Sequence, residues 1–121
     1  MTETVLEMAG VRVLLAPPAA RALSTERDAT DLIGDALGAG AAWVAVPAAA
    51  FDPQVFDLSS RRLGEFAQKF VNYRVGLAIL GDISADLDRS GALRDFVRES
   101  NQGRHLWFLE DQAALSERLG G

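Results

Sequence analysis

Carboxylates and serine hydroxyls recur at the predicted strand ends of this 121-residue chain. Asp57 is followed by Ser59 and Ser60 at the start of a helical pattern, and Asp82 is followed by Ser84 just after an apolar strand. A serine at a helix N-terminus could accept a phosphate, because free N–H groups favour anions there. The ordinary alternative is that Ser59 or Ser60 caps the helix. The carboxylates could instead hold Mg²⁺ or act as acid and base.

Further acidic residues follow the predicted strands and should lie at the same edge of the sheet. They are Asp86, Asp88, Glu110 and Asp111. Ligands of an open parallel sheet gather beyond the carboxyl ends of its strands, so this acidic edge could bind a small molecule or a metal ion. Solvated loops and helix caps are the usual role of such residues. Their spacing matches no calcium-binding loop, and we predict neither a resident metal nor a cofactor.

A second set of polar residues interrupts elements that otherwise look buried. Its members are Glu65, Tyr73, Arg74, Arg94, Asp95, Arg98, Glu99 and Asn101. Arg94 and Arg98 lie four residues apart on one helical face, where like charges are mildly unfavourable without a partner. This face could be solvated, could form a salt-bridge network with Glu65, or could dock another protein. The three interpretations remain open at this point.

The sequence offers no combination of side chains that defines a catalytic site. It has no cysteine, which excludes a thiolate nucleophile, a disulfide and a cysteine metal site. The single histidine, His105, is predicted at the end of the sheet opposite the acidic edge, so no Ser–His–Asp group is expected. Gly34, Gly38 and Gly40 fall at the end of a helix and not between a strand and a helix, as a dinucleotide loop requires. We therefore predict no catalytic residue.

The composition argues against two classes of partner. The formal net charge is −5, whereas nucleic-acid binding requires a basic surface. The longest uncharged run, residues 36–51, is shorter than the ~20 residues of a membrane span and is broken by glycine and proline. The N-terminus shows no basic segment followed by an apolar one. We expect a cytoplasmic protein whose partner is another protein or a second copy of the chain.

The element that should position the two serines is an amphipathic helix within residues 56–74. Its apolar residues recur at the spacing of one helical face. They are Leu63, Phe66, Ala67, Phe70 and Val71. Ser59 or Ser60 should cap its start, and Asn72 should end it. The run that follows, residues 75–80, is apolar throughout, as expected for a strand covered on both faces.

Apolar runs at five places predict strands: 4–9, 11–16, 42–46, 75–80 and 106–109. Helical patterns follow the last four of them, so four helices are predicted. Ala9-Gly10 should form a hairpin turn. This order predicts a single α/β domain over residues 1–121, with a mixed, mostly parallel five-stranded sheet, an N-terminal hairpin and about four helices.

Local signals mark the boundaries of the first helix and of the strand before it. Pro17-Pro18 should end the second strand, because proline cannot donate to a strand ladder. Thr25 and Asp28 have the spacing of a capping box. Leu37 belongs to the buried stripe predicted for this helix, and Gly40 is a natural C-terminal cap.

Several motifs are similar to those of a known family. They are Phe56-Asp57-Leu58, Gly64-Glu65, Gln68-Lys69-Phe70, Asn72-Tyr73-Arg74, Gly81-Asp82, Leu93-Arg94-Asp95-Phe96 and Glu99-Ser100-Asn101. Through them the chain resembles a bacterial family known as domain of unknown function 4180, over roughly its C-terminal two thirds. It departs from the family pattern at Arg61-Arg62-Leu63, where small residues are expected. The resemblance implies a family and no activity.

The predicted order of elements also resembles, more distantly, the STAS domain of anti-sigma-factor antagonists. In that family a phosphorylatable serine follows an aspartate at the start of the helix after the third strand. Asp57-Leu58-Ser59-Ser60 occupies the corresponding place here, with one residue inserted and with Arg61 in place of a glycine. Architecture alone does not confer function.

Together these observations predict a non-catalytic, STAS-like regulatory or protein-interaction module. The alternative is a small-molecule or metal-binding protein, or an enzyme, that uses Asp57, Ser60 and Asp82 at the acidic edge.

Overall fold

The computed structural model describes residues 4–16 and 22–121 of the chain. Its strands are β1 (Thr4–Met8), β2 (Val11–Leu15), β3 (Trp43–Pro47), β4 (Gly76–Leu80) and β5 (Leu106–Leu109). Its α-helices are α1 (Glu26–Ala39), α2 (Arg62–Asn72), α3 (Ser84–Arg89), α4 (Gly91–Gln102) and α5 (Gln112–Gly120). Three short 3-10 helices connect β3 to α2: η1 (Ala48–Ala50), η2 (Pro53–Phe56) and η3 (Leu58–Ser60).

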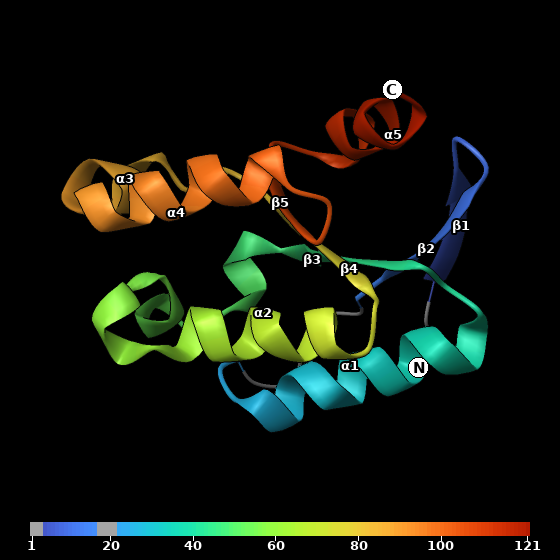
Figure 1. Cartoon of the computed structure of the whole chain (residues 1–121), viewed down its shortest axis with the longest axis horizontal. Helices are drawn as coiled ribbons and strands as arrows, with labels where there is room; N and C mark the ends of the chain where they lie inside the picture. The colour runs from blue at the N-terminus through green and yellow to red at the C-terminus, as the bar shows by residue number, and fades with distance from the viewer. Residues whose placement is uncertain (1–3, 17–21) are drawn as a thin grey trace.

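The strands form one sheet in chain order, β1-β2-β3-β4-β5 (Figure 1). β1 pairs antiparallel with β2, and the remaining neighbours are parallel. Ala9 and Gly10 make the hairpin turn with φ of 52° and 81°, the positive values that a two-residue hairpin requires. The predicted mixed, mostly parallel α/β fold with an N-terminal hairpin is confirmed. The predicted role of Pro17-Pro18 lies outside the described residues.

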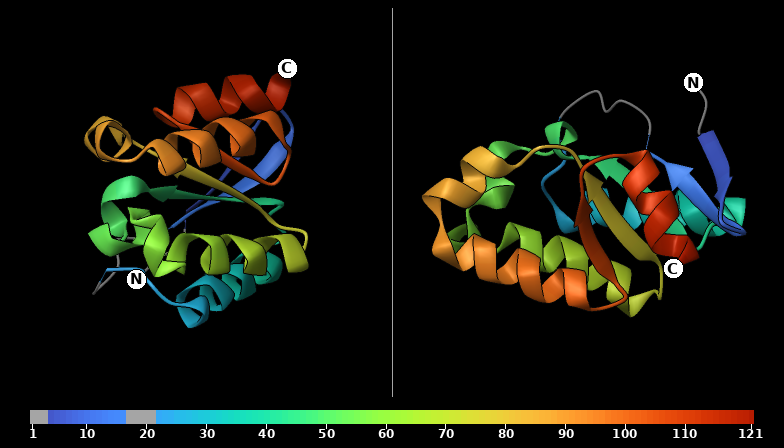
Figure 2. Two further views of the ribbon diagram at one scale, coloured as in Figure 1. Left: turned by 60° about the vertical axis from the view of Figure 1, so that its left-hand side comes forward. Right: turned by 90° about the horizontal axis from the view of Figure 1, so that it is seen from above.

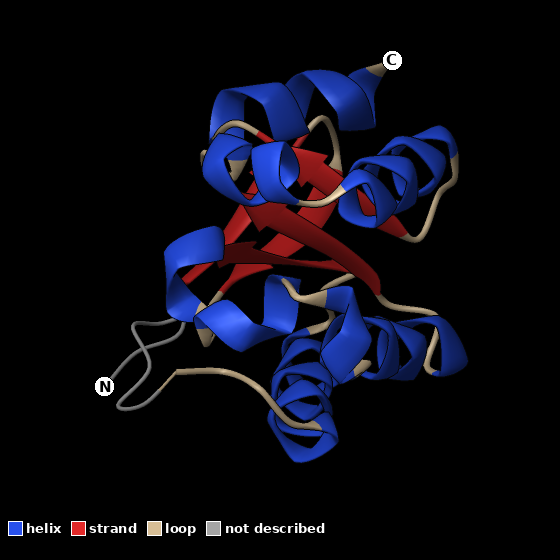
Figure 3. Cartoon of the chain, turned by 90° about the vertical axis from the view of Figure 1, so that its left-hand side faces the viewer, coloured by secondary structure: helices blue, strands red, loops and turns tan. Residues whose placement is uncertain are grey.

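Helices pack on both faces of this sheet (Figure 3). α1 and α2 lie side by side (Figures 1 and 2), and with α4 they cover the face that carries Leu14, Val44 and Leu77. Among the described helices, α5 packs on the opposite face, where it contacts β1 and β5. The larger of the two apolar cores therefore lies between the sheet and α1, α2 and α4.

The apolar face of α2 is buried, as the spacing of its apolar residues predicts. Leu63, Phe66 and Phe70 of α2 are fully buried. Thr25 caps α1 in the predicted capping box with Asp28, and Gly40 ends α1 with φ of 69°. Leu37 is a correction, because it is 56% exposed. It lies at the margin of the α1 stripe in the last turn, where Ala36 already fills the position against the sheet.

The helix count is a second correction. The described residues form five α-helices and not four, because α3 precedes α4 in the segment after β4, where a single helix was predicted. α3 has six residues, and none of them is buried. A short helix of this kind has no apolar stripe for the sequence to reveal.

On the α5 face of the sheet, the rings of Trp43 and Trp107 contact each other across β4, at a position where β4 has a glycine. Trp43 of β3 is paired in register with Gly76 of β4. A Cβ at Gly76 would lie 2.2 Å from the Trp43 ring. The ring therefore passes over β4 and stacks on Trp107 of β5, with 4.2 Å between ring centroids. Gly76 is required here for close approach and not for a special backbone angle.

Candidate docking site at the carboxyl edge of the sheet

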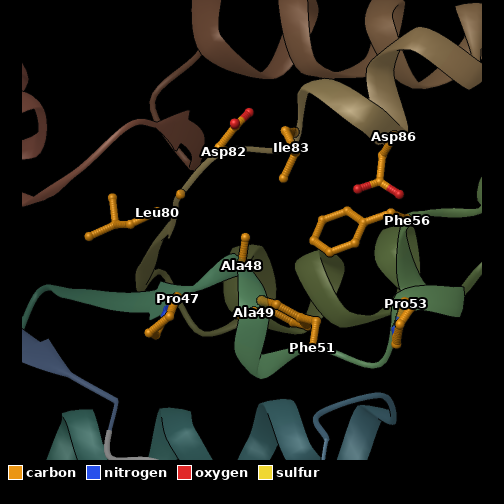
Figure 4. Close-up of a pocket in the computed structure, with 11 residues that line it drawn as sticks. Pro47, Ala48, Ala49, Phe51, Pro53, Phe56, Leu80, Asp82, Ile83 and Asp86 are labelled. Carbon is orange, nitrogen blue, oxygen red and sulfur yellow. The ribbon is translucent and has the colours of Figure 1, made fainter.

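An open hollow of about 320 Å³ lies where β3 and β4 end (Figure 4). We call it the carboxyl-edge hollow. Its lining residues are Pro47, Ala48, Ala49, Phe51, Pro53, Phe56, Leu80, Gly81, Asp82, Ile83 and Asp86. The η1–η2 segment supplies one wall, and the turn from β4 into α3 supplies the other. The walls are mainly apolar, and the two carboxylates are the charged groups among these residues.

Two local contacts fix the positions of the walls. Gly81 leaves β4 with φ of 138°, and a Cβ there would lie 3.3 Å from the Cβ of Ala48. The two walls therefore approach each other closely at their base, where only a glycine fits without strain. Phe51 stacks edge-on against Phe56 and Phe66, with centroids 5.8 Å and 5.1 Å apart. This aromatic contact fixes the η1–η2 wall on the core.

Asp82 is an ionised turn residue at the rim of the hollow. Its Oδ1 accepts a hydrogen bond from the Ser84 backbone N–H, with an N···O distance of 2.9 Å. The backbone and side-chain hydrogen bonds from Ser84 lower the pKa of Asp82. Asp86, also at the rim, pairs with Arg89 at 2.9 Å. Because its pKa is lowered, Asp82 is better suited to attract a cation than to donate a proton.

Asp57 has the same local role in a different place. Its Oδ1 accepts from the Ser59 hydroxyl at 2.7 Å and from the Ser59 backbone N–H at 3.0 Å. The side-chain bond, followed by the backbone bond, lowers the pKa of Asp57. Asp57 lines a neighbouring hollow of about 350 Å³, which shares Pro53, Phe56 and Asp86 with the first. The structure thus places Asp57 and Asp82 in two adjoining hollows.

The Ser60 hydroxyl makes its hydrogen bonds to nearby backbone groups. The Ser60 hydroxyl lies 2.8 Å from the Asp57 carbonyl and 3.0 Å from the Gln54 carbonyl, and its oxygen accepts from the Arg62 N–H at 3.3 Å. Ser60 therefore binds the first N–H of α2, as expected, but the N-cap position belongs to Arg61, with φ of 64°. The capping prediction was wrong by one position, because η3 ends in a left-handed residue before α2 begins. Asn72 is the last residue of α2, as predicted, and Tyr73 is its C-cap.

Asn101, from the second predicted set, connects α4 to the edge strand β5 by two hydrogen bonds. Its Oδ1 accepts from the Phe108 N–H at 2.7 Å, and its Nδ2 donates to the Phe108 carbonyl at 3.2 Å. β5 is the last strand in the sheet order, so one side of its backbone lacks a neighbouring strand. The carboxamide of Asn101 substitutes for that strand at one residue. Sequence reasoning missed this role, because nothing in the sequence says which strand is at the edge.

The other members of that set are spread over several contacts. Arg98 pairs with Asp95 at 2.9 Å, and both side chains are mostly exposed. Arg94 donates to the Leu87 carbonyl of α3 at 2.5 Å. Within the described residues, no ion pair joins α4 to Glu65 of α2.

The remaining three members lie on the surface around the start of β4 and β5. Tyr73 is 52% exposed, and Arg74 turns the chain into β4 with φ of 59°. Glu99 lines a groove of about 380 Å³ between α2 and α4, together with the exposed residue His105. These side chains are available for contact, but they do not form one network.

The described residues assemble neither a metal site nor a membrane span. No three histidine, aspartate or glutamate side chains come together as metal ligands in residues 4–16 and 22–121. No helix in that part of the chain combines the length and the apolar character needed to cross a membrane.

Fold and site together define a small α/β domain with an open apolar hollow, rimmed by carboxylates, at the carboxyl edge of its sheet. The chain belongs to the family described as Domain of unknown function (DUF4180), whose model matches residues 8–119. The family resemblance seen in the sequence is confirmed. No curated protein and no solved structure matches the chain, so the likeness to STAS domains stays a prediction.

Proposed function

We propose that this protein is a non-catalytic, cytoplasmic protein-interaction module with a regulatory role, and that its partner docks at the carboxyl-edge hollow. One observation carries the proposal: the hollow is apolar and open, and two carboxylates, Asp82 and Asp86, lie at its rim. Apolar walls favour burial of a side chain, and the rim favours a cation. The regulatory role rests on the resemblance to STAS domains predicted from the order of elements in the sequence.

The partner should present a basic residue beside an apolar one. Asp82 and Asp86 line the hollow, Asp57 lines the adjoining hollow, and Glu110 lines a further one together with Asp82. An exposed acidic surface steers a basic partner and raises the rate of association, an effect that added salt weakens. The same charge disfavours nucleic acid as the partner.

Two exposed alanines offer a matched test. Ala49 lines the hollow, whereas Ala42 lies just before β3 at the opposite end of the sheet. Ala49→Arg fills the hollow and reduces its negative charge, and Ala42→Arg makes the same chemical change elsewhere. A partner should first be captured with the wild-type protein and then purified. Its affinity for all three proteins should be measured by calorimetry at rising salt, after melting curves confirm that the variants fold.

We expect Ala49→Arg to abolish binding, Ala42→Arg to retain it, and salt to weaken it. Equal affinity of the partner for wild type and Ala49→Arg would show that the hollow is not the docking surface. The alternative, a small-molecule site, draws on one observation, since the hollow is at the lower end of the ~300–1,000 Å³ typical of ligand pockets. Binding of a small cation that Ala49→Arg abolishes, without any protein partner, would favour that alternative.

A further inference from the structure

A second hollow, of about 530 Å³, lies at the opposite end of the sheet, where β3 and β5 begin. We call it the amino-edge hollow. Its walls include Trp43, Trp107, Gln102, Arg104 and Arg118. It opens on the α5 face and shares no lining residue with the carboxyl-edge hollow. The proposed function does not use it.

The charged side chains that line this hollow are both positive. Two arginines, Arg104 and Arg118, line it, and the described residues that line it include no aspartate or glutamate. This is unusual for a chain whose net charge is −5. Arg104 also lines the groove between α2 and α4 that contains Glu99. Arg104 is exposed, and it forms no ion pair or hydrogen bond with the described residues. Its donors are therefore free for a ligand.

Carbonyl groups at the end of α4 would ordinarily oppose an anion here, because a helix C-terminus carries partial negative charge. In this structure two of them already accept hydrogen bonds. The Arg118 guanidinium donates to the Asn101 carbonyl, and the Trp107 indole N–H donates to the Gly103 carbonyl at 2.9 Å. The negative end of the helix is thereby partly neutralised from within the hollow.

The hollow is also held in shape before any ligand arrives. Trp43 and Trp107 stack on each other, and the Arg118 guanidinium lies 4.4 Å from the centre of the Trp107 ring. Stacking and the bond to Asn101 fix the direction of Arg118. A pre-organised guanidinium loses little freedom when it binds a planar anion, and it offers two parallel donors to a carboxylate or a phosphate.

We propose that the amino-edge hollow binds a small molecule through a carboxylate or phosphate group. Arg104 and Arg118 donate to the anionic group, Gln102 contributes a neutral amide, and the indole edges of Trp43 and Trp107 contact the apolar part of the molecule. The site is separate from the carboxyl-edge hollow, so each can fail its test without the other.

The protein carries its own reporter for this site. Its two tryptophans, Trp43 and Trp107, both line the hollow, so intrinsic fluorescence reports on the wall itself. The full chain should be titrated with inorganic phosphate and, separately, with citrate, with sodium chloride at matched ionic strength as the blank. Calorimetry on the same samples detects binding that leaves the fluorescence unchanged.

We expect saturable binding of at least one of the two anions and none in the chloride blank. Arg104→Gln should raise the dissociation constant about tenfold or more, because a hydrogen bond between charged groups is lost. The control is Arg74→Gln, which removes another exposed arginine, one that lies outside the hollow and whose side chain makes no hydrogen bond or ion pair with the described residues. It should bind as wild type does. Preference for phosphate or for citrate then tells which anionic group the site favours.

Two results would overturn the proposal. One is the absence of saturable binding of both anions by calorimetry as well as fluorescence. The other is equal weakening by Arg104→Gln and Arg74→Gln, which would mean a diffuse attraction to positive charge and not a site. Arg118→Lys provides a further check, because it keeps the charge but loses the paired donors; unchanged affinity in that variant would also contradict the assigned geometry.

Discussion

At the scale of single residues, the acidic side chains of the carboxyl edge act on the backbone next to them. Asp82 binds Ser84, and Asp57 binds Ser59. Both carboxylates are fully exposed, and hydrogen bonds lower the pKa of each. The sequence indicated that Asp82 follows a strand and that Asp57 lies before α2, and both are found there. It could not show that Oδ1 of each carboxylate already accepts a hydrogen bond, because that depends on the exact turn geometry.

The lowered pKa of Asp82 predicts how its contribution depends on pH. A carboxyl group whose pKa is lower in the folded state stabilises the fold above its ordinary value of about 3.9, and this stabilisation is lost as pH falls through the folded value. Asp82→Asn should therefore melt below wild type at neutral pH, and the two melting temperatures should converge in acid. The control is Asp88→Asn, since the Asp88 side chain is exposed and makes no hydrogen bond with the described residues. Melting curves of Asp82→Asn that stay parallel to wild type at all pH values would contradict the assigned turn.

Gly76 gives a residue-scale test of the tryptophan stack. Gly76→Ala places a methyl group 2.2 Å from the Trp43 ring. The ring must move, at a cost of about 1–3 kcal/mol typical of overpacking, and the fluorescence spectrum should change as the stack opens. The control is Gly34→Ala in α1, where a Cβ meets nothing within 4 Å. That change should stabilise by about 0.5–1 kcal/mol, the helix preference of alanine over glycine. Equal melting temperatures for the two variants would be inconsistent with the observed packing.

At the scale of elements, the start of α2 depends more on the hydroxyl of Ser60 than on that of Ser59. Ser60 Oγ connects the Gln54 or Asp57 carbonyl to the Arg62 N–H, and so joins η2, η3 and α2. Ser59 is exposed, and its hydroxyl binds the exposed carboxylate of Asp57. Water can replace an exposed partner more readily than a half-buried one.

Ser60→Ala should therefore cost about 0.5–1.5 kcal/mol, the usual net value of an intramolecular hydrogen bond. Ser59→Ala should change stability by less than about 0.5 kcal/mol, as exposed substitutions generally do. Chemical denaturation of both variants measures the difference. A larger loss for Ser59→Ala would mean that Ser59, and not Ser60, supports the helix start.

Sequence patterns predicted the elements whose burial gives them a clear period. α2 has Leu63, Phe66 and Phe70 at helical spacing, and each strand is an apolar run. α3 was missed because its six residues include no buried one. Its position matters for the site, since Ile83 and Asp86 form a wall of the carboxyl-edge hollow. The hollow itself arises from the η1–η2 segment folding back over the core, a tertiary arrangement that local patterns do not encode.

At the scale of the whole molecule, the two ends of the sheet differ in charge. The carboxyl edge carries the acidic turns, and the amino-edge hollow carries arginines and no acid among its described lining residues. A net charge of −5 conceals this division. The basic partner and the small anion proposed above would therefore use surfaces of opposite charge at opposite ends of the sheet and would not compete for one surface.

The two faces of the sheet are unequally covered, and this predicts where the molecule opens first. α2 buries Leu63, Phe66, Ala67 and Phe70, whereas Leu115 is the one buried residue of α5. Elements with few buried apolar groups open locally at lower free energy than the core. We therefore expect the amides of α5 to exchange hydrogen through a local opening, well before those of β4. Native-state hydrogen exchange at low denaturant measures both.

Two variants separate local from global opening. Leu115→Ala and Phe70→Ala each truncate a fully buried side chain, at a cost of about 2–5 and 3–5 kcal/mol. Leu115→Ala should speed exchange in α5 more than in β4, because the lost contacts are those that α5 makes with the sheet. Phe70→Ala should speed exchange in β4 at least as much as in α5, since it weakens the core shared by α1, α2 and α4. Exchange of α5 and β4 at one common rate in the wild-type protein would contradict this prediction. It would mean that the whole domain opens as a single unit, and that Leu115 alone is enough to couple the opening of α5 to that of the sheet.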